Sequence, residues 1–237
     1  MTRRRKSKGR LLYLLILLVV LIFLYQLRYE FLFKGAIINM AFTLILSAIV
    51  YGTRGGKRVM TGLLVIGVPW IVLAWVYYFF EMPLLVVLYY LIMTVLFGYV
   101  ISVLMRHIME AERVSEDLLY GAGCIYLLLG YAWSGVYMCI ELVRPGSFVM
   151  SGQNVLQTMD YTGQLVYFSF TTLTTLGYGD ITPAYSLGRS VVILEAITGV
   201  LFMSMLVGIL VGIYVAHSRK VASNRRDLEN GDEHRGD

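Results

Sequence analysis

The residues best suited to a chemical task are the five at positions 175–179, which read Thr-Leu-Gly-Tyr-Gly. Gly177 and Gly179, at alternate positions, open backbone angles that other residues avoid. Successive carbonyl groups can then point the same way, whereas those of an ordinary strand alternate. Stacked rings of such carbonyl oxygens replace the water shell of a cation, and the hydroxyl of Thr175 adds one more ring. The stretch therefore predicts a backbone that coordinates cations.

A short helix is expected directly before this stretch, over residues 164–175. At about 12 apolar, Thr-rich residues, the helix is too short to cross a hydrocarbon layer of ~30 Å. Non-helical backbone at membrane depth must be buried in protein or line water. The partially negative end of the helix also favours a cation. A glycine-rich turn in an external loop is the alternative interpretation of residues 175–179.

Composition places the chain in a membrane. Of its 237 residues, 58% are hydrophobic, 15% are charged and only two are cysteine. A soluble domain carries about a quarter charged residues, so a soluble globule, a disordered chain and a disulfide scaffold are all excluded. The net charge of +5 does not indicate nucleic acid, because the basic residues lie between long apolar runs. The composition predicts an all-α membrane protein.

Six apolar runs are long enough to be membrane spans, at approximately 11–27, 36–51, 59–80, 83–105, 118–142 and 190–215. Placing the N-terminus in the cytoplasm puts 16 of the 20 Lys and Arg residues on the cytoplasmic side. Because basic residues concentrate in cytoplasmic loops, both termini are expected in the cytoplasm.

These spans suggest the following division of the chain. A basic cytoplasmic arm (1–10) precedes a four-helix transmembrane domain (11–105) and a cytoplasmic linker (106–117). A pore domain (118–215) then comprises an outer helix (118–142), a turret (143–163), a pore helix (164–175), a filter (175–179) and an inner helix (189–215). The cytoplasmic tail (216–237) is short and polar, so we expect little order in it.

Residues 175–180, Thr-Leu-Gly-Tyr-Gly-Asp, resemble the T-V-G-Y-G-D filter signature of the tetrameric potassium channel superfamily, with Leu176 as the one departure. The run from about 116 to 215 also resembles the compact bacterial six-helix channels of that superfamily. The first 105 residues resemble them in hydropathy and layout, as a voltage-sensor-like domain without its arginines.

The resemblance implies roles for further residues. Carbonyls of residues 175–178 would hold K⁺, and Asp180 would brace the outer mouth. Gly199 stands where many such channels have a hinge glycine. The remaining filter supports would be the pore-helix residues Thr171 and Thr172 and the aromatic residues Tyr167 and Phe168. Because a chain with one filter supplies a quarter of each carbonyl ring, the resemblance implies a homotetramer.

The fourth span contains no Lys or Arg, and Arg106 only ends it. Voltage sensing requires charges that move through the field, at ~2.3 kcal/mol per charge per 100 mV. We therefore expect little or no voltage sensing and a scaffold role for the first four helices. The basic arm and tail either bind anionic lipid headgroups or only fix the topology.

Glu195 is the only ionisable residue expected well inside a span, which makes it a functional candidate. It lies one turn before Gly199 and is expected to face the pore helix or a neighbouring helix, with Thr171–Thr174 as its expected hydrogen-bond partners. Two roles are compatible with Glu195, a structural buttress and a pH-sensitive gate. Further along, Met203, Val207 and Val211 recur every four residues and either line an inner vestibule or pack against lipid and helices.

These features together predict a potassium-selective channel in the plasma membrane of a prokaryote. A weakly selective cation channel and a non-conducting scaffold subunit are the alternatives. We expect no enzyme, because Ser, His and Asp are not arranged as a nucleophilic site. No cofactor is expected beyond K⁺ as the permeating ion, and the expected partners are three identical subunits and membrane lipids.

Overall fold

The computed structural model describes residues 10–26, 34–52, 56–79, 83–111, 115–158 and 160–233. The helices in these ranges are α1 (Arg10–Gln26), α2 (Lys34–Gly52), α3 (Lys57–Phe79), α4 (Pro83–Met109), α5 (Glu116–Val143), α6 (Tyr161–Leu173) and α7 (Ser186–Glu233). Three short strands and one 3₁₀ turn complete them: β1 (Phe148–Met150), β2 (Gln153–Asn154), η2 (Val155–Gln157) and β3 (Ile181–Pro183). The predicted basic arm, up to residue 9, and the loop residues Arg28, Arg54 and Arg113 lie outside the described residues.

Four of the described helices are long and apolar enough to cross a membrane, over Lys57–Val76, Leu84–Met109, Glu116–Val143 and Ser186–Gly212. This agrees with the predicted all-α membrane class. The apolar parts of α1 and α2 are shorter, at Leu11–Gln26 and Ile38–Val50. Six spans therefore stay a prediction.

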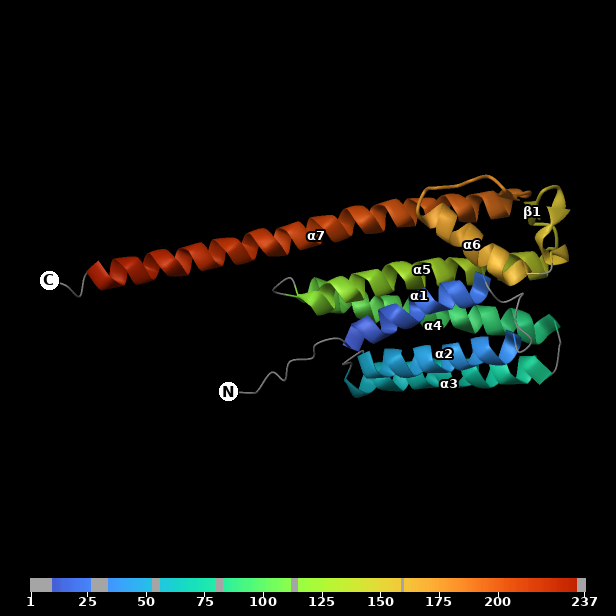
Figure 1. Ribbon diagram of the computed structural model, residues 1–237, viewed down its shortest axis with the longest axis horizontal. Coiled ribbons are helices and arrows are strands. Elements are labelled where there is room, and N and C mark those ends of the chain that lie inside the picture. Colours follow the sequence, from blue (N-terminus) through green and yellow to red (C-terminus); the bar gives the residue numbers. More distant parts are fainter. Residues whose placement is uncertain are drawn as a thin grey trace.

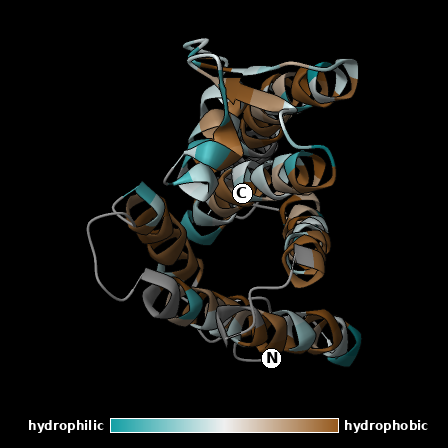
Figure 2. Ribbon diagram, turned by 90° about the vertical axis from the view of Figure 1, so that its right-hand side faces the viewer, coloured by the Kyte–Doolittle hydropathy of each residue, from teal (hydrophilic) through white to brown (hydrophobic). Residues whose placement is uncertain are grey.

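The helices run side by side, and the short α6 slants between α5 and α7 (Figure 1). α4 packs along α5 more extensively than any other pair of elements, and α1 packs against both α5 and α6. Figure 2 shows that hydrophobic residues make up most of the helices. Large apolar side chains such as Val65, Leu84 and Leu91 are exposed, as expected where lipid rather than water surrounds a protein.

Aromatic side chains connect the first four helices to the later ones. The Trp70 ring lies 4.9 Å from that of Phe42 and 5.8 Å from that of Phe97. Tyr131 on α5 donates a hydrogen bond to the carbonyl of Leu18 on α1 at 2.9 Å. Its ring also meets Phe170 on α6 edge-on at 5.4 Å. The two halves of the chain therefore share one core.

Two predicted boundaries differ from the structure. α4 continues to Met109 and α5 begins at Glu116, where the Ser115 side chain accepts from the Leu118 N–H. The predicted linker 106–117 therefore shortens to 110–115. The expectation of a poorly ordered tail is wrong, because α7 continues to Glu233. Residues 216–233 include many helix-forming residues, and extending an existing helix avoids the cost of nucleation.

Candidate functional site

The short helix α6 begins three residues before the predicted start. The Asp160 side chain accepts from the Gly163 N–H at 3.3 Å and caps this end. The helix has 13 residues and ends at Leu173, where the Thr174 N–H donates to the Phe170 carbonyl at 3.1 Å. Thr171 and Thr172, predicted filter supports, are buried at this end. α6 therefore ends inside the protein. Residues 174–180 follow it, and we call them the filter loop.

The first turn of the filter loop forms around one oxygen atom. The N–H groups of Leu176 and Gly177 both donate to the Thr171 carbonyl, at 2.9 and 3.0 Å. The described peptide bonds are trans, so each carbonyl points opposite to the N–H of the next residue. The carbonyls of Thr175 and Leu176 therefore both point away from α6, toward the exposed side of the loop.

Every second residue of the filter loop has a left-handed backbone. The φ angles are +61° at Thr175, +49° at Gly177 and +78° at Gly179. Two of these positions are glycine, which adopts such angles without strain, and Thr175 adopts one at a cost. Positive φ at every second residue is the geometry that allows successive carbonyls to face one direction.

The side chains of Leu176 and Tyr178 stand out from the single chain, with 55% and 68% of their surfaces exposed. All residues from Thr174 to Asp180 are exposed, while the α6 residues behind them are largely buried. The filter loop therefore presents its backbone oxygens and two large side chains at the surface of one subunit.

The outer end of the filter loop is held by Asp180 and a small sheet. The Asp180 carboxylate interacts electrostatically with the Tyr167 side chain on α6 and accepts from the Ile181 N–H at 3.1 Å. β3 follows directly and pairs antiparallel with β1, in the strand order β2-β1-β3. Behind these strands, the Phe168 ring lies 5.5 Å from that of Phe148. The loop is thus fastened to α6 at one end and to the sheet at the other.

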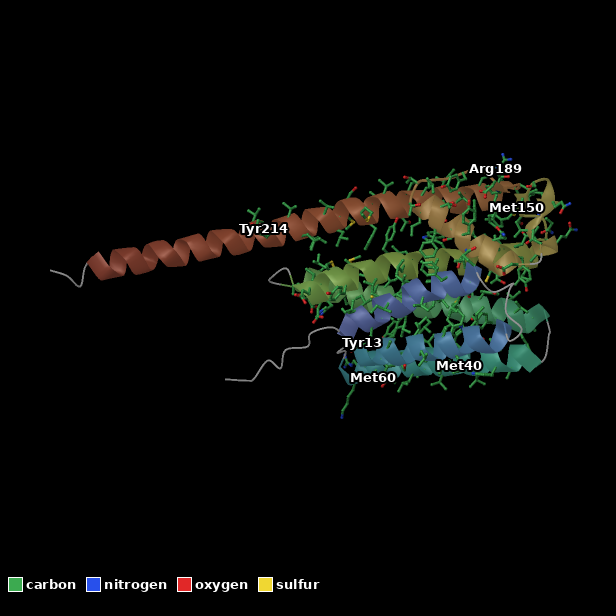
Figure 3. All side chains as sticks on the ribbon, in the orientation of Figure 1. Tyr13, Met40, Met60, Met150, Arg189 and Tyr214 are labelled. Atoms are coloured by element: carbon green, nitrogen blue, oxygen red, sulfur yellow. The ribbon has the colours of Figure 1, made fainter. Side chains whose placement is uncertain are left out.

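The same end of the molecule carries Met150 and Arg189, opposite to Tyr13 and Met60 (Figure 3). The Arg189 guanidinium donates to the carbonyls of Pro183 and Ala184 at 3.3 and 3.5 Å. Arg144 lies over the ring of Tyr185, 3.8 Å from its centre. Arg144 and Arg189 therefore hold the chain that follows the filter loop.

Glu141 is a buried carboxylate that the sequence analysis did not find. It is fully buried near the end of α5 and accepts hydrogen bonds from the N–H groups of Gly146 and Phe148, at 2.6 and 2.7 Å. Its position at the edge of the predicted span 118–142 concealed it. The signal was the Pro145-Gly146 turn that follows, because the N–H groups after a helix-ending proline need an acceptor.

Glu195 faces α5 and α6, as predicted, and is fully buried. Its carboxyl group is hydrogen-bonded to Tyr137 on α5 and lies 2.5 Å from the hydroxyl of Ser169 on α6. The expected partners in Thr171–Thr174 are wrong, because the side chain of Glu195 meets α6 about one turn before them.

Gly199 contacts α6, whereas the predicted stripe further along α7 is exposed in the single chain. A Cβ at Gly199 would collide with the backbone carbonyl of Leu173, so this glycine permits close contact with α6. The helix runs through it without a break. Met203, Val207 and Val211 are exposed by 47%, 56% and 56% in the single chain. Their roles as a hinge and a gate stay predictions.

Residues 124–216 match a protein-family model described as "Ion channel". The match begins in α5 and ends in α7, so it contains α6, the filter loop, Glu141 and Glu195. No curated protein matches the chain. With the membrane-length helices, the match supports an ion channel that lies in a membrane.

Proposed function

We propose that the protein is a potassium-selective channel that conducts K⁺ passively through the filter loop. The observation that carries this proposal is the backbone of residues 175–179, with positive φ at every second residue and the first two carbonyls turned away from α6. The carbonyls of Thr175, Leu176, Gly177 and Tyr178 and the Thr175 hydroxyl would replace the hydration shell of the ion.

Four copies of the chain would assemble around the pore. One filter loop supplies one oxygen to each ring, and a K⁺ cage needs four such segments. The exposed Leu176 and Tyr178 would then be covered by neighbouring subunits, as would part of the apolar surface of α7. The assembly is a homotetramer with 24 membrane helices if α1 and α2 also span.

The first four helices would act as a scaffold around the pore. The basic residues of α4 are Arg106 and His107 in its last turn, so no charge sits where the membrane field could move it. The proposed location is a prokaryotic plasma membrane, with both termini in the cytoplasm and the basic segments near anionic lipid headgroups.

Flux of K⁺ into liposomes containing the purified protein tests the proposal. Gly177→Ala should abolish the flux, because an Ala at φ +49° is strained and disturbs the carbonyls. Gly152→Ala is the matched control. Gly152 also has positive φ, at +81°, and open space around it, but it lies in the β1–β2 turn. If both variants conduct equally, the filter loop is not the conduction path.

The second candidate is a weakly selective cation channel, because Leu176 stands where the filter signature has Val. Reversal potentials under opposing K⁺ and Na⁺ gradients distinguish the two functions. A tetramer that conducts neither ion, under several conditions of pH and membrane tension, would be a scaffold subunit instead.

A further inference from the structure

Three buried oxygen-bearing side chains meet behind the filter loop, each from a different helix. Glu195 of α7, Tyr137 of α5 and Ser169 of α6 have no exposed surface. The Tyr137 hydroxyl donates to one carboxyl oxygen of Glu195, and the Ser169 hydroxyl lies 2.5 Å from the other. Ser169 also lies 2.7 Å from the carbonyl oxygen of Gly130 on α5.

The hydrogen atoms in this cluster can be counted. Ser169 has one hydroxyl hydrogen, yet its oxygen makes two short contacts with other oxygen atoms. The Gly130 carbonyl can only accept, so the hydrogen of Ser169 satisfies that contact. The contact between Ser169 and Glu195 then needs a hydrogen from the carboxyl group. A neutral Glu195 that donates to Ser169 and accepts from Tyr137 satisfies every contact.

The charges around Glu195 lead to the same protonation state. α5 and α6 contain no Lys, Arg or His, and neither does α7 from Ser190 to Ala216. Among the described residues, two titratable side chains of α5 interact with Glu195. The Tyr137 hydroxyl contacts its carboxyl group, and the Tyr126 hydroxyl lies within range of its electrostatic effect. The Glu141 carboxyl is turned to Gly146 and Phe148. A carboxylate without a cationic partner is expensive at such a place.

Glu141 provides the contrast within the same chain. Both of its oxygens accept from backbone N–H groups, and an ionised carboxylate offers only acceptors. The contacts of Glu141 therefore need only acceptors, whereas those of Glu195 also need a donor. Two fully buried carboxyl groups of one subunit thus have opposite hydrogen-bonding requirements.

We propose that Glu195 is a proton-binding site which, in its neutral form, fastens α7 to α6 and α5, and that its deprotonation at alkaline pH closes the conduction path. An ionised Glu195 draws the hydrogen of Ser169 to itself and leaves two acceptors facing each other at Gly130. Ser169 lies two residues before Thr171 on α6. The carbonyl of Thr171 holds the first turn of the filter loop. The effect on conduction rests on the proposed function, while the proton site does not.

Infrared spectroscopy of the purified protein tests the proton site without ion flux. At neutral pH the wild type should show the carbonyl stretch of a buried protonated carboxylic acid. Glu195→Gln should remove this band, and the control Glu141→Gln should retain it. A spectrum in which Glu195→Gln removes only carboxylate bands would overturn the proposal.

Liposome flux tests the coupling. Wild-type flux should be lost reversibly at alkaline pH, whereas Glu195→Gln, whose amide donates and accepts as the neutral acid does, should lack this loss. Identical alkaline profiles in both proteins would overturn the coupling to conduction. If the infrared band is present but no preparation conducts K⁺ at any pH, the proton site stands and the proposed function fails.

Discussion

The carboxylate of Glu141 accepts a hydrogen bond of 2.7 Å from the backbone N–H of Phe148, which joins the end of α5 to strand β1. β1 in turn pairs with β3, and Phe148 is the register partner of Pro183. β3 begins directly after Asp180, the last residue of the filter loop. Glu141, which lies far from the filter loop in sequence, is therefore connected through the sheet to the outer end of that loop.

Replacing Glu141 by Gln should destabilise the protein. The amide NH₂ cannot accept, so one of the two backbone N–H groups loses its buried partner, at a cost of about 1–3 kcal/mol. Thermal unfolding in detergent measures this loss. Glu110→Gln is the control, because Glu110 is exposed at the end of α4. Equal melting temperatures for both variants would show that Glu141 does not support the turret.

Gly199→Ala should weaken the contact between α7 and α6. The new methyl group meets the backbone carbonyl of Leu173, which cannot rotate away as a side chain would, and overpacking of this kind costs about 1–3 kcal/mol. Gly98→Ala in α4 has open space and should be neutral or slightly stabilising. Thermal unfolding compares the two. A Gly199→Ala protein that is as stable as wild type but rarely opens would favour the hinge instead.

Tyr167→Phe should shorten the conducting periods seen in single-channel recordings. The substitution removes the hydroxyl group that interacts with Asp180, and the exposure of Asp180 keeps the loss to about 1 kcal/mol. Tyr185→Phe is the matched control, because it also removes a hydroxyl but retains the ring under Arg144. Unchanged conducting periods in Tyr167→Phe would remove Tyr167 from the filter supports.

The sequence was most informative where the backbone itself is unusual. The alternate glycines Gly177 and Gly179 and the short Thr-rich helix before them predicted the filter loop, because few structures require that combination. Hydropathy placed α3, α4, α5 and the apolar part of α7 closely for a similar reason. A long apolar run in a membrane can satisfy its backbone hydrogen bonds only as a helix or within a closed barrel.

Contacts between helices could not be predicted from the sequence. Hydropathy is the same whether a side chain faces lipid or another helix, so it could not show that Glu195 meets Ser169 rather than Thr171. It also could not show that Gly199 fits against Leu173. The strands β1, β2 and β3 have three residues or fewer, too few to show an alternating pattern. The role of Glu141 depends on its contact with this sheet, so a sequence analysis that did not predict the sheet could not identify Glu141.

Membrane voltage should have little effect on conductance. Each charge that crosses the whole field contributes ~2.3 kcal/mol per 100 mV, but the basic residues of α4, Arg106 and His107, lie in its last turn. Planar-bilayer recordings should give a shallow conductance–voltage relation. A relation steep enough to require several gating charges per subunit would contradict the scaffold role of α1–α4.

Leu176→Val should leave the preference for K⁺ over Na⁺ unchanged. The oxygen that residue 176 offers belongs to the backbone, and its direction follows from the bond between the Gly177 N–H and the Thr171 carbonyl. Reversal potentials in mixed K⁺ and Na⁺ solutions measure the preference. Thr175→Ala is the positive control, because it deletes a side-chain oxygen from the ion path and should reduce the discrimination. If Leu176→Val shifts the reversal potential as far as Thr175→Ala does, side-chain packing around the loop, and not the carbonyls alone, sets the size of the ion cage.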